Sequence, residues 1–173
     1  MKVSELIKSA GFTPGTKNDG EVKTNHFILG IQTETSQTKE VDYTVAGPHV
    51  EALGQSIESE TEDANYMYEG KSTSRTSAQR KFEVSGKRLA GDAFQDWACS
   101  HKIKYGTGSD VIVPYVYFNA LTGKGEKGSL TINVTSDGDG DANALAAFTV
   151  EASSVGIPTA VSYTHLRAHE TGA

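Results

Sequence analysis

The stretch covering residues 80–118 constrains the fold most, because it carries the pattern of two strands with a short helix between them. Phe82 and Val84 alternate with polar residues, and this period of two predicts a strand with one buried face. Residues 111–118 are apolar on both faces and rich in β-branched and aromatic side chains, which is typical of a strand buried on both sides. A chain organised around this stretch is expected to be mainly β.

A helix is predicted between these two strands. Asp92 stands at an N-cap position and Gln95 follows three residues later, which is the spacing of a capping box. The residues at helical spacing on one face are Phe94, Trp97, Ala98 and His101. A helix of about three turns is too short to be stable alone. We therefore expect Phe94, Trp97 and Ala98 to pack in the core, against a sheet.

Five further segments show strand patterns, and the most regular are residues 129–135 and 146–152. These two are expected to pair as an antiparallel hairpin around an acidic turn at residues 136–143. The other three segments are residues 26–32, 41–46 and 49–58, the last with an expected bulge at Gly54. With about seven strands and one helix, the predicted fold is mainly β, a β-sandwich or rolled barrel with a flanking α-helix.

The chain is expected to divide into three parts. Residues 1–24 form an N-terminal helix or arm, with Val3, Leu6 and Ile7 on one side of the helix. Residues 25–160 form the β domain, whose length suits a single core. Residues 161–173 are interpreted as a non-native tail, because residues 161–171 (VSYTHLRAHET) resemble a translated sequencing adapter. On this interpretation the natural C-terminus is missing, and the zinc-like spacing of His165 and His169 has no meaning.

Composition excludes several classes of function. A net charge of −6 does not suggest a general nucleic-acid binder. The single cysteine, Cys99, rules out a disulfide framework within the chain and is expected to be a small packed residue. The sequence has neither an apolar run long enough for a membrane helix nor the apolar stretch of a signal peptide.

Motifs for metal, phosphate and catalytic sites fail when they are tested. The alternating acids from Asp137 suggest a calcium loop, but Ala142 and Phe148 occupy the positions that need glycine and an acid. A phosphate-binding loop ending at Lys71 lacks its first glycine, which is replaced by Asn65. No nucleophile, base and acid form a recognisable set. We therefore expect no enzyme activity, no cofactor and no metal.

Residues 60–79 form a long polar segment whose only apolar patch is Tyr66, Met67 and Tyr68. Long segments of this kind are often functional, so one interpretation is a mobile loop that contacts a partner. The alternative is a two-stranded ribbon whose aromatic residues fold back on the sheet. The sequence favours neither interpretation.

The order of six features resembles the major tail proteins, or tail tube proteins, of long-tailed bacteriophages. In chain order they are VDYTVAG from residue 41, YMYEG from residue 66, FEVSG from residue 82, GDAFQDW from residue 91, VIVPYVYF from residue 111, and a hairpin with DGDGD from residue 137 that ends at VGIP from residue 155. Together they extend over about two-thirds of the chain.

The resemblance implies a structural subunit of the phage tail, located in the virion and assembled in the host cytoplasm. Such subunits form hexameric rings that stack into a tube around a tape-measure protein, with tail-tip and terminator proteins as further partners and no membrane. DNA passes through the channel without specific binding, which a negative net charge would favour. The segment of residues 60–79 would contact the adjacent ring, with Tyr66, Met67, Tyr68 and Arg75 as contacts.

Two other functions remain open at this stage. A carbohydrate-binding or adhesin-type β-sandwich would carry exposed aromatic residues on a concave sheet face. A tube protein of the related secretion systems would share the architecture of the phage tube, and neighbouring genes rather than composition would distinguish it.

Overall fold

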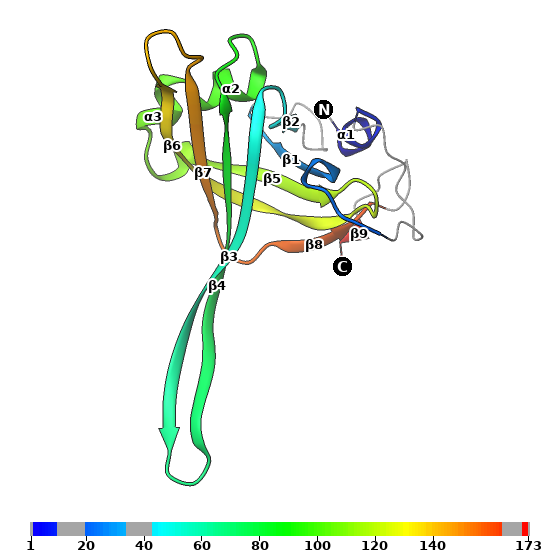
Figure 1. Ribbon diagram of the computed structural model, residues 1–173. Coiled ribbons are helices and arrows are strands. Elements are labelled where there is room, and N and C mark those ends of the chain that lie inside the picture. The colour runs from blue at the N-terminus through cyan, green and yellow to red at the C-terminus, as the bar shows by residue number, and fades with distance from the viewer. Residues whose placement is uncertain (1, 10–19, 34–42, 164–170, 173) are drawn as a thin grey trace.

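The computed structural model describes residues 2–9, 20–33, 43–163 and 171–172, and in this part of the chain the strands form one antiparallel sheet (Figure 1). Along the sheet the order is β2-β1-β5-β6-β7-β4-β3, and β8 and β9 continue from one side of β6. The strands are β1 (Phe27–Ile31), β2 (Thr44–Val45), β3 (Val50–Tyr66), β4 (Gly70–Lys87), β5 (Ile112–Asn119), β6 (Lys124–Asp139), β7 (Ala147–Ser154), β8 (Thr159–Ser162) and β9 (Thr171–Gly172). The predicted mainly β fold is confirmed.

The sheet rolls over, so that strands distant in its order face each other. The ring of Phe82 in β4 lies 4.8 Å from the ring of Tyr117 and 5.6 Å from that of Tyr115 in β5, centroid to centroid. In the sheet, β6 and β7 separate these two strands. The interior between them also holds the buried side chains of Leu29, Ile31, Val84, Leu130, Ile132, Phe148 and Val150. Of the two expected arrangements, this is the rolled sheet.

A second core lies on the opposite face of β1 and β5, under helix α1 (Val3–Ser9). Leu6 of α1 is fully buried there together with Val116 and Phe118 of β5. Their neighbours Tyr115 and Tyr117 belong to the interior of the roll. Because successive side chains of a strand point to opposite faces, β5 is buried on both sides, as its sequence predicts.

The predicted three-turn helix is two shorter helices, α2 (Ala93–Ala98) and α3 (His101–Tyr105). Asp92 does cap α2, since its carboxylate accepts a hydrogen bond of 3.1 Å from the backbone N–H of Gln95. The helix ends at Cys99, and the extended backbone of Ser100 starts α3. Because of this break, the side chain of Ile103 is buried in the core. His101, which was predicted on the apolar face of the helix, is exposed.

Three strand details differ from the sequence prediction. Gly54 pairs regularly with Glu83, and the register of the β3–β4 pair shifts elsewhere, between Val50 and Ala52 and between Glu60 and Thr61. Residues 124–128, which precede the predicted strand 129–135, already begin β6, and glycine at 125 lets β6 approach the backbone of β5 where any Cβ would clash. The acidic residues up to Asp139 extend β6, and the turn follows them. The predicted pairing of β6 with β7 is confirmed.

At the C-terminal end, β8 pairs with β6, and Val161 and Tyr163 are buried in the second core. Residues 164–170, including the histidine pair of the rejected zinc pattern, lie outside the described residues. The interpretation of residues 161–173 as a non-native tail stays a prediction from the sequence.

Candidate assembly surfaces

The most prominent feature of the molecule is the hairpin formed by β3 and β4, which continues far beyond the rolled body (Figure 1). Its strands pair as far as Tyr66 and Gly70, with one register shift between Glu60 and Thr61, which leaves residues 67–69 as the connecting loop. Gly70 has a φ of +80°, in the left-handed region that favours glycine. Residues 60–79 are thus an extended two-stranded ribbon, and their aromatic residues do not fold back on the sheet.

The shaft of the hairpin is polar and solvent-exposed. Residues 58–79 are exposed apart from a half-buried Ala64, and Ile57 at their start is 58% exposed. Asp63 accepts a hydrogen bond of 2.6 Å from the Thr73 hydroxyl and lies 3.2 Å from the Lys71 ammonium. These two partners, Thr73 first, lower the pKa of the Asp63 carboxyl below its ordinary value. Cross-strand contacts of this kind, rather than a core, hold the shaft together.

The tip of the hairpin gathers three of the four residues predicted as ring contacts. Tyr66, Met67 and Tyr68 are 55%, 88% and 91% exposed. Consecutive exposed apolar side chains at the end of a projection are typical of an interaction site. Arg75, the fourth predicted contact, is exposed on the shaft, where it is paired with Thr61 in the strand register, and is therefore separate from the tip.

An ionic cluster marks the root, where the hairpin leaves the body. The Nε atom of Arg80 lies 2.8 Å from Oε1 of Glu126, as an ion pair rather than an aligned hydrogen bond. The Arg80 guanidinium also lies 5.3 Å from the ring centre of Phe82 and 5.2 Å from that of Tyr117. Burial raises the pKa of Tyr117 and of neighbouring Tyr115, whose hydroxyl points to Glu126. No motif in the sequence identifies this cluster.

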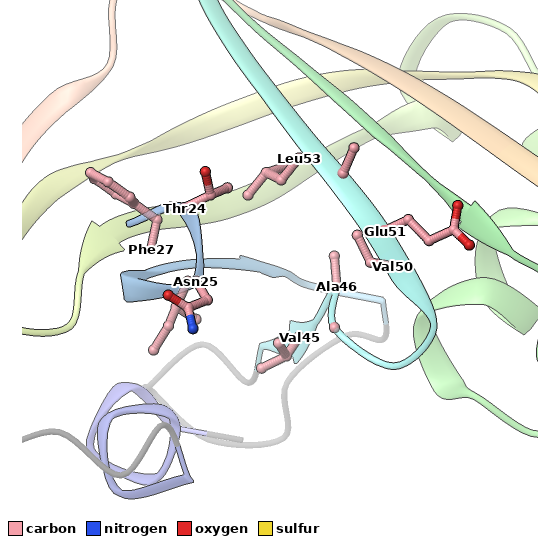
Figure 2. A pocket seen from close by; sticks show the side chains of 11 residues that line it. Thr24, Asn25, Phe27, Val45, Ala46, Val50, Glu51 and Leu53 are labelled. Carbon is pink, nitrogen blue, oxygen red and sulfur yellow. The ribbon is translucent and has the colours of Figure 1, made fainter. Parts of the chain in front are cut away.

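A pocket lies between the two ends of the rolled sheet, and we call it the seam pocket (Figure 2). Its volume is about 390 Å³, and it is formed by the beginning of β1, by β2 and by the beginning of β3. Its apolar lining includes Phe27, Val45, Ala46, Val50 and Leu53, and its polar lining includes Thr24, Asn25 and Glu51. β2 and β3 are the first and last strands of the sheet order and do not pair with each other, so the pocket lies in the gap between the two edges of the rolled sheet.

The residues predicted for the core helix lie inside the body rather than at a surface site. Phe94 and Ala98 are fully buried and Trp97 is partly buried against the same core. Gln95, expected only as the third residue of a capping box, is fully buried. Its side-chain amide donates to the carbonyls of Pro48 and Lys87 and accepts from the N–H of Leu89. Gln95 therefore joins α2 to the chain segments on both sides of the β3–β4 hairpin.

The described residues hold no group of three or more His, Cys, Asp or Glu side chains arranged to bind a metal ion. Cys99 is half-buried, and burial raises the pKa of its thiol, which disfavours the reactive thiolate. Among the helices that the structure describes, none combines the length and the apolar character needed to cross a membrane.

Comparison with protein families finds no match, and comparison with curated proteins finds none either. Solved structures do match. A chain from the "Virion of native gene transfer agent (GTA) particle" superposes with a TM-score of 0.55 at 13% identity, covering 82% of this chain and 100% of that chain. A chain from the "Tail of empty GTA particle computed with helical refinement, C6 symmetry" gives a TM-score of 0.54 at 14% identity, covering 80% and 98%. This protein therefore has the fold of a chain found in the tail of a gene transfer agent.

Proposed function

We propose that this chain is a structural subunit of a phage-type tail tube. In this proposal six copies close into a ring, rings stack into a tube, and DNA passes along the central channel without specific binding. One observation carries it: the fold likeness extends over 98% of a chain from a tail with C6 symmetry. Sequence identity of 14% makes this a likeness of fold, and the function is our inference from it.

The exposed hairpin supports the stacking of rings. A closed ring removes sheet edges within its own plane, but successive rings need contacts that reach along the axis. The hairpin projects beyond the body and ends in the apolar tip, so we propose Tyr66, Met67 and Tyr68, with Arg75 on the shaft, as the contacts to the adjacent ring.

The remaining partners follow from the same role. A tape-measure protein would occupy the tube during assembly in the host cytoplasm, and tip and terminator proteins would cap its ends. The role is structural rather than catalytic. A secretion-system tube would use the same architecture. A carbohydrate-binding module is less favoured, because the exposed tyrosines lie on a narrow tip (Tyr66 and Tyr68) and at the end of helix α3 (Tyr105) rather than on a concave sheet face.

The proposal is tested by light scattering and negative-stain microscopy of the purified full chain over a series of concentrations. We expect rings of six 18.4 kDa chains, about 110 kDa, and tubes of uniform diameter with a central hole. Rotational averaging should give six-fold symmetry. A stable dimer, or a ring with a different number of subunits, would contradict the hexamer. A monomer at every concentration that binds a glycan saturably would replace the tube with the binding-module function.

A further inference from the structure

The molecule has an exposed apolar projection at one end of β3 and an apolar pocket near the other end. The projection is the tip, Tyr66, Met67 and Tyr68, at the end of β3. The seam pocket is lined by residues from the beginning of β3, including Val50 and Leu53 (Figure 2). No segment of the described chain fills the pocket, and none covers the tip.

We propose that the tip of one copy inserts into the seam pocket of a second copy in the next ring. This inference rests on the tube function proposed above and names the surface that receives the hairpin. The partner is a second copy because the tube proposal places identical chains one above the other, and each chain then supplies both halves of the contact.

The chemistry of the two surfaces matches. The apolar side chains of Phe27, Val45 and Leu53 line a pocket whose volume of about 390 Å³ falls within the range of sites that enclose small ligands. Tyrosine has an apolar ring and a hydroxyl that needs a partner once it is buried. The polar side chains of Thr24 and Asn25 belong to the same pocket and would provide such partners. A lining of this kind suits a Tyr-Met-Tyr tip better than it suits the charged shaft.

The positions of the two surfaces also explain how stacking would propagate. A projection that fits a pocket elsewhere on the same molecule makes a head-to-tail contact, and such a contact repeats without closing. Every ring would then offer free pockets on one side and free tips on the other, which gives the tube a direction. Six equivalent contacts per ring would act together, so stable stacking does not require a high affinity of each single contact.

The geometry limits the spacing between rings. Residues 53–66 span roughly 43 Å along β3 at about 3.3 Å per residue. If a tip enters a pocket in the next ring, the rise from ring to ring cannot exceed the distance from pocket to tip in one copy. We therefore expect a rise of at most roughly 45 Å for the assembled tube.

Cysteine cross-linking tests the contact directly in the full chain. The native cysteine is removed by Cys99→Ser, and Met67→Cys is combined with Leu53→Cys. Under mild oxidation of assembled protein we expect a ladder of disulfide-linked oligomers from the 67–53 pair. Ala52→Cys replaces Leu53→Cys if the latter lowers the melting temperature, because Ala52 lines the same pocket and is exposed.

The matched control combines Met67→Cys with Leu145→Cys, since Leu145 is a 71% exposed apolar residue outside the pocket. A ladder from the control pair and none from the pocket pair overturns the proposal. Six-fold tubes without cross-linking of either pocket pair overturn it as well, and leave the tube function standing. A chain that forms no ring or tube before any substitution overturns both.

A second experiment separates stacking from ring closure. Replacing all three tip residues with serine should raise the protein concentration needed for tubes at least tenfold while single rings still form. Tubes that assemble at the unchanged concentration, or a measured rise well above 45 Å, contradict insertion of the tip into the pocket.

Discussion

The rolled body and the projecting hairpin share strands β3 and β4, but different interactions stabilise each of them. In the body, side chains such as Phe82 and Val84 of β4 are buried in an aromatic and aliphatic core. A few residues earlier in the same strand, residues 70–79 are exposed on both faces. The transition occurs at Arg80, whose half-buried guanidinium lies over the first aromatic rings of the core.

This difference indicates which region can exist alone. A two-stranded ribbon in water is marginally stable, and each cross-strand pair contributes only about 0.2–1 kcal/mol. The body has a core of buried aromatic and aliphatic side chains, whereas the hairpin beyond residue 57 has almost none. A long projection without a core is therefore best explained by a partner that covers it, which is what stacking of rings would supply.

The sharpest test of the contrast exchanges one large aromatic residue for alanine in each region. Phe148→Ala, in the fully buried part of β7, should lower the free energy of unfolding by about 3–5 kcal/mol, because it leaves a cavity in a packed core. Tyr68→Ala at the 91% exposed tip should change it by less than about 0.5 kcal/mol. Urea denaturation followed by Trp97 fluorescence measures both. Equal effects would mean that the tip packs on the body in solution.

Glycine substitutions compare the backbones of the two regions. Gly86 lies in β4 where a Cβ would meet the backbone of His49 and Val50, so Gly86→Ala should destabilise the body by about 2–3 kcal/mol. At the tip, Gly70 has open space around it and a φ of +80°, so Gly70→Ala should cost about 1–2 kcal/mol, confined to the hairpin. Thermal unfolding detects the first change, and amide hydrogen exchange in residues 60–79 detects the second. Loss of exchange protection throughout the body in Gly70→Ala would contradict the prediction that this substitution affects the hairpin alone.

The sequence predicted the elements that depend on local pattern and missed those that depend on closure of the sheet. Alternation located β6 and β7, and an apolar run located β5 and showed that it is buried on both faces. The tip was visible because Tyr66, Met67 and Tyr68 interrupt a polar run. The seam pocket was not, because β2 and β1 lie at one end of the sheet order and β3 at the other, and they meet only when the sheet rolls. The first residues of β6, ahead of residue 129, were not predicted as strand, since glycines that permit close strand packing resemble glycines that permit turns.

The root of the hairpin offers a test of how the two regions are joined. Glu126→Gln removes the ionic partner of Arg80, whose side chain is 14% exposed, and should destabilise the body by about 1–2 kcal/mol because it leaves a poorly solvated cation. On the shaft, Asp63→Asn removes the partner of Lys71, and because both side chains are exposed to solvent it should leave the urea midpoint unchanged. Equilibrium unfolding in urea distinguishes the two effects. A smaller loss from Glu126→Gln than from Asp63→Asn would show that the root cluster does not anchor the hairpin.

The smallest effect should appear on the shaft in acid. The pKa of Asp63 is lowered from its ordinary value of 3.8, first by the hydrogen bond from Thr73 and then by Lys71. A carboxyl with a lowered pKa stabilises the folded form above the pKa of the unfolded chain, and this contribution disappears as the pH falls through the folded pKa. The carboxyl carbon resonance of Asp63, followed by NMR, should therefore titrate with a midpoint below 3.8. Thr73→Val should move the midpoint upward while the resonances of Phe148 and Val150 stay fixed. A midpoint at or above 3.8 in the unaltered chain would mean that Asp63 does not contact Thr73 and Lys71 in solution. The strands of the shaft would then be paired only when a partner covers them, whereas the body is held by its own core.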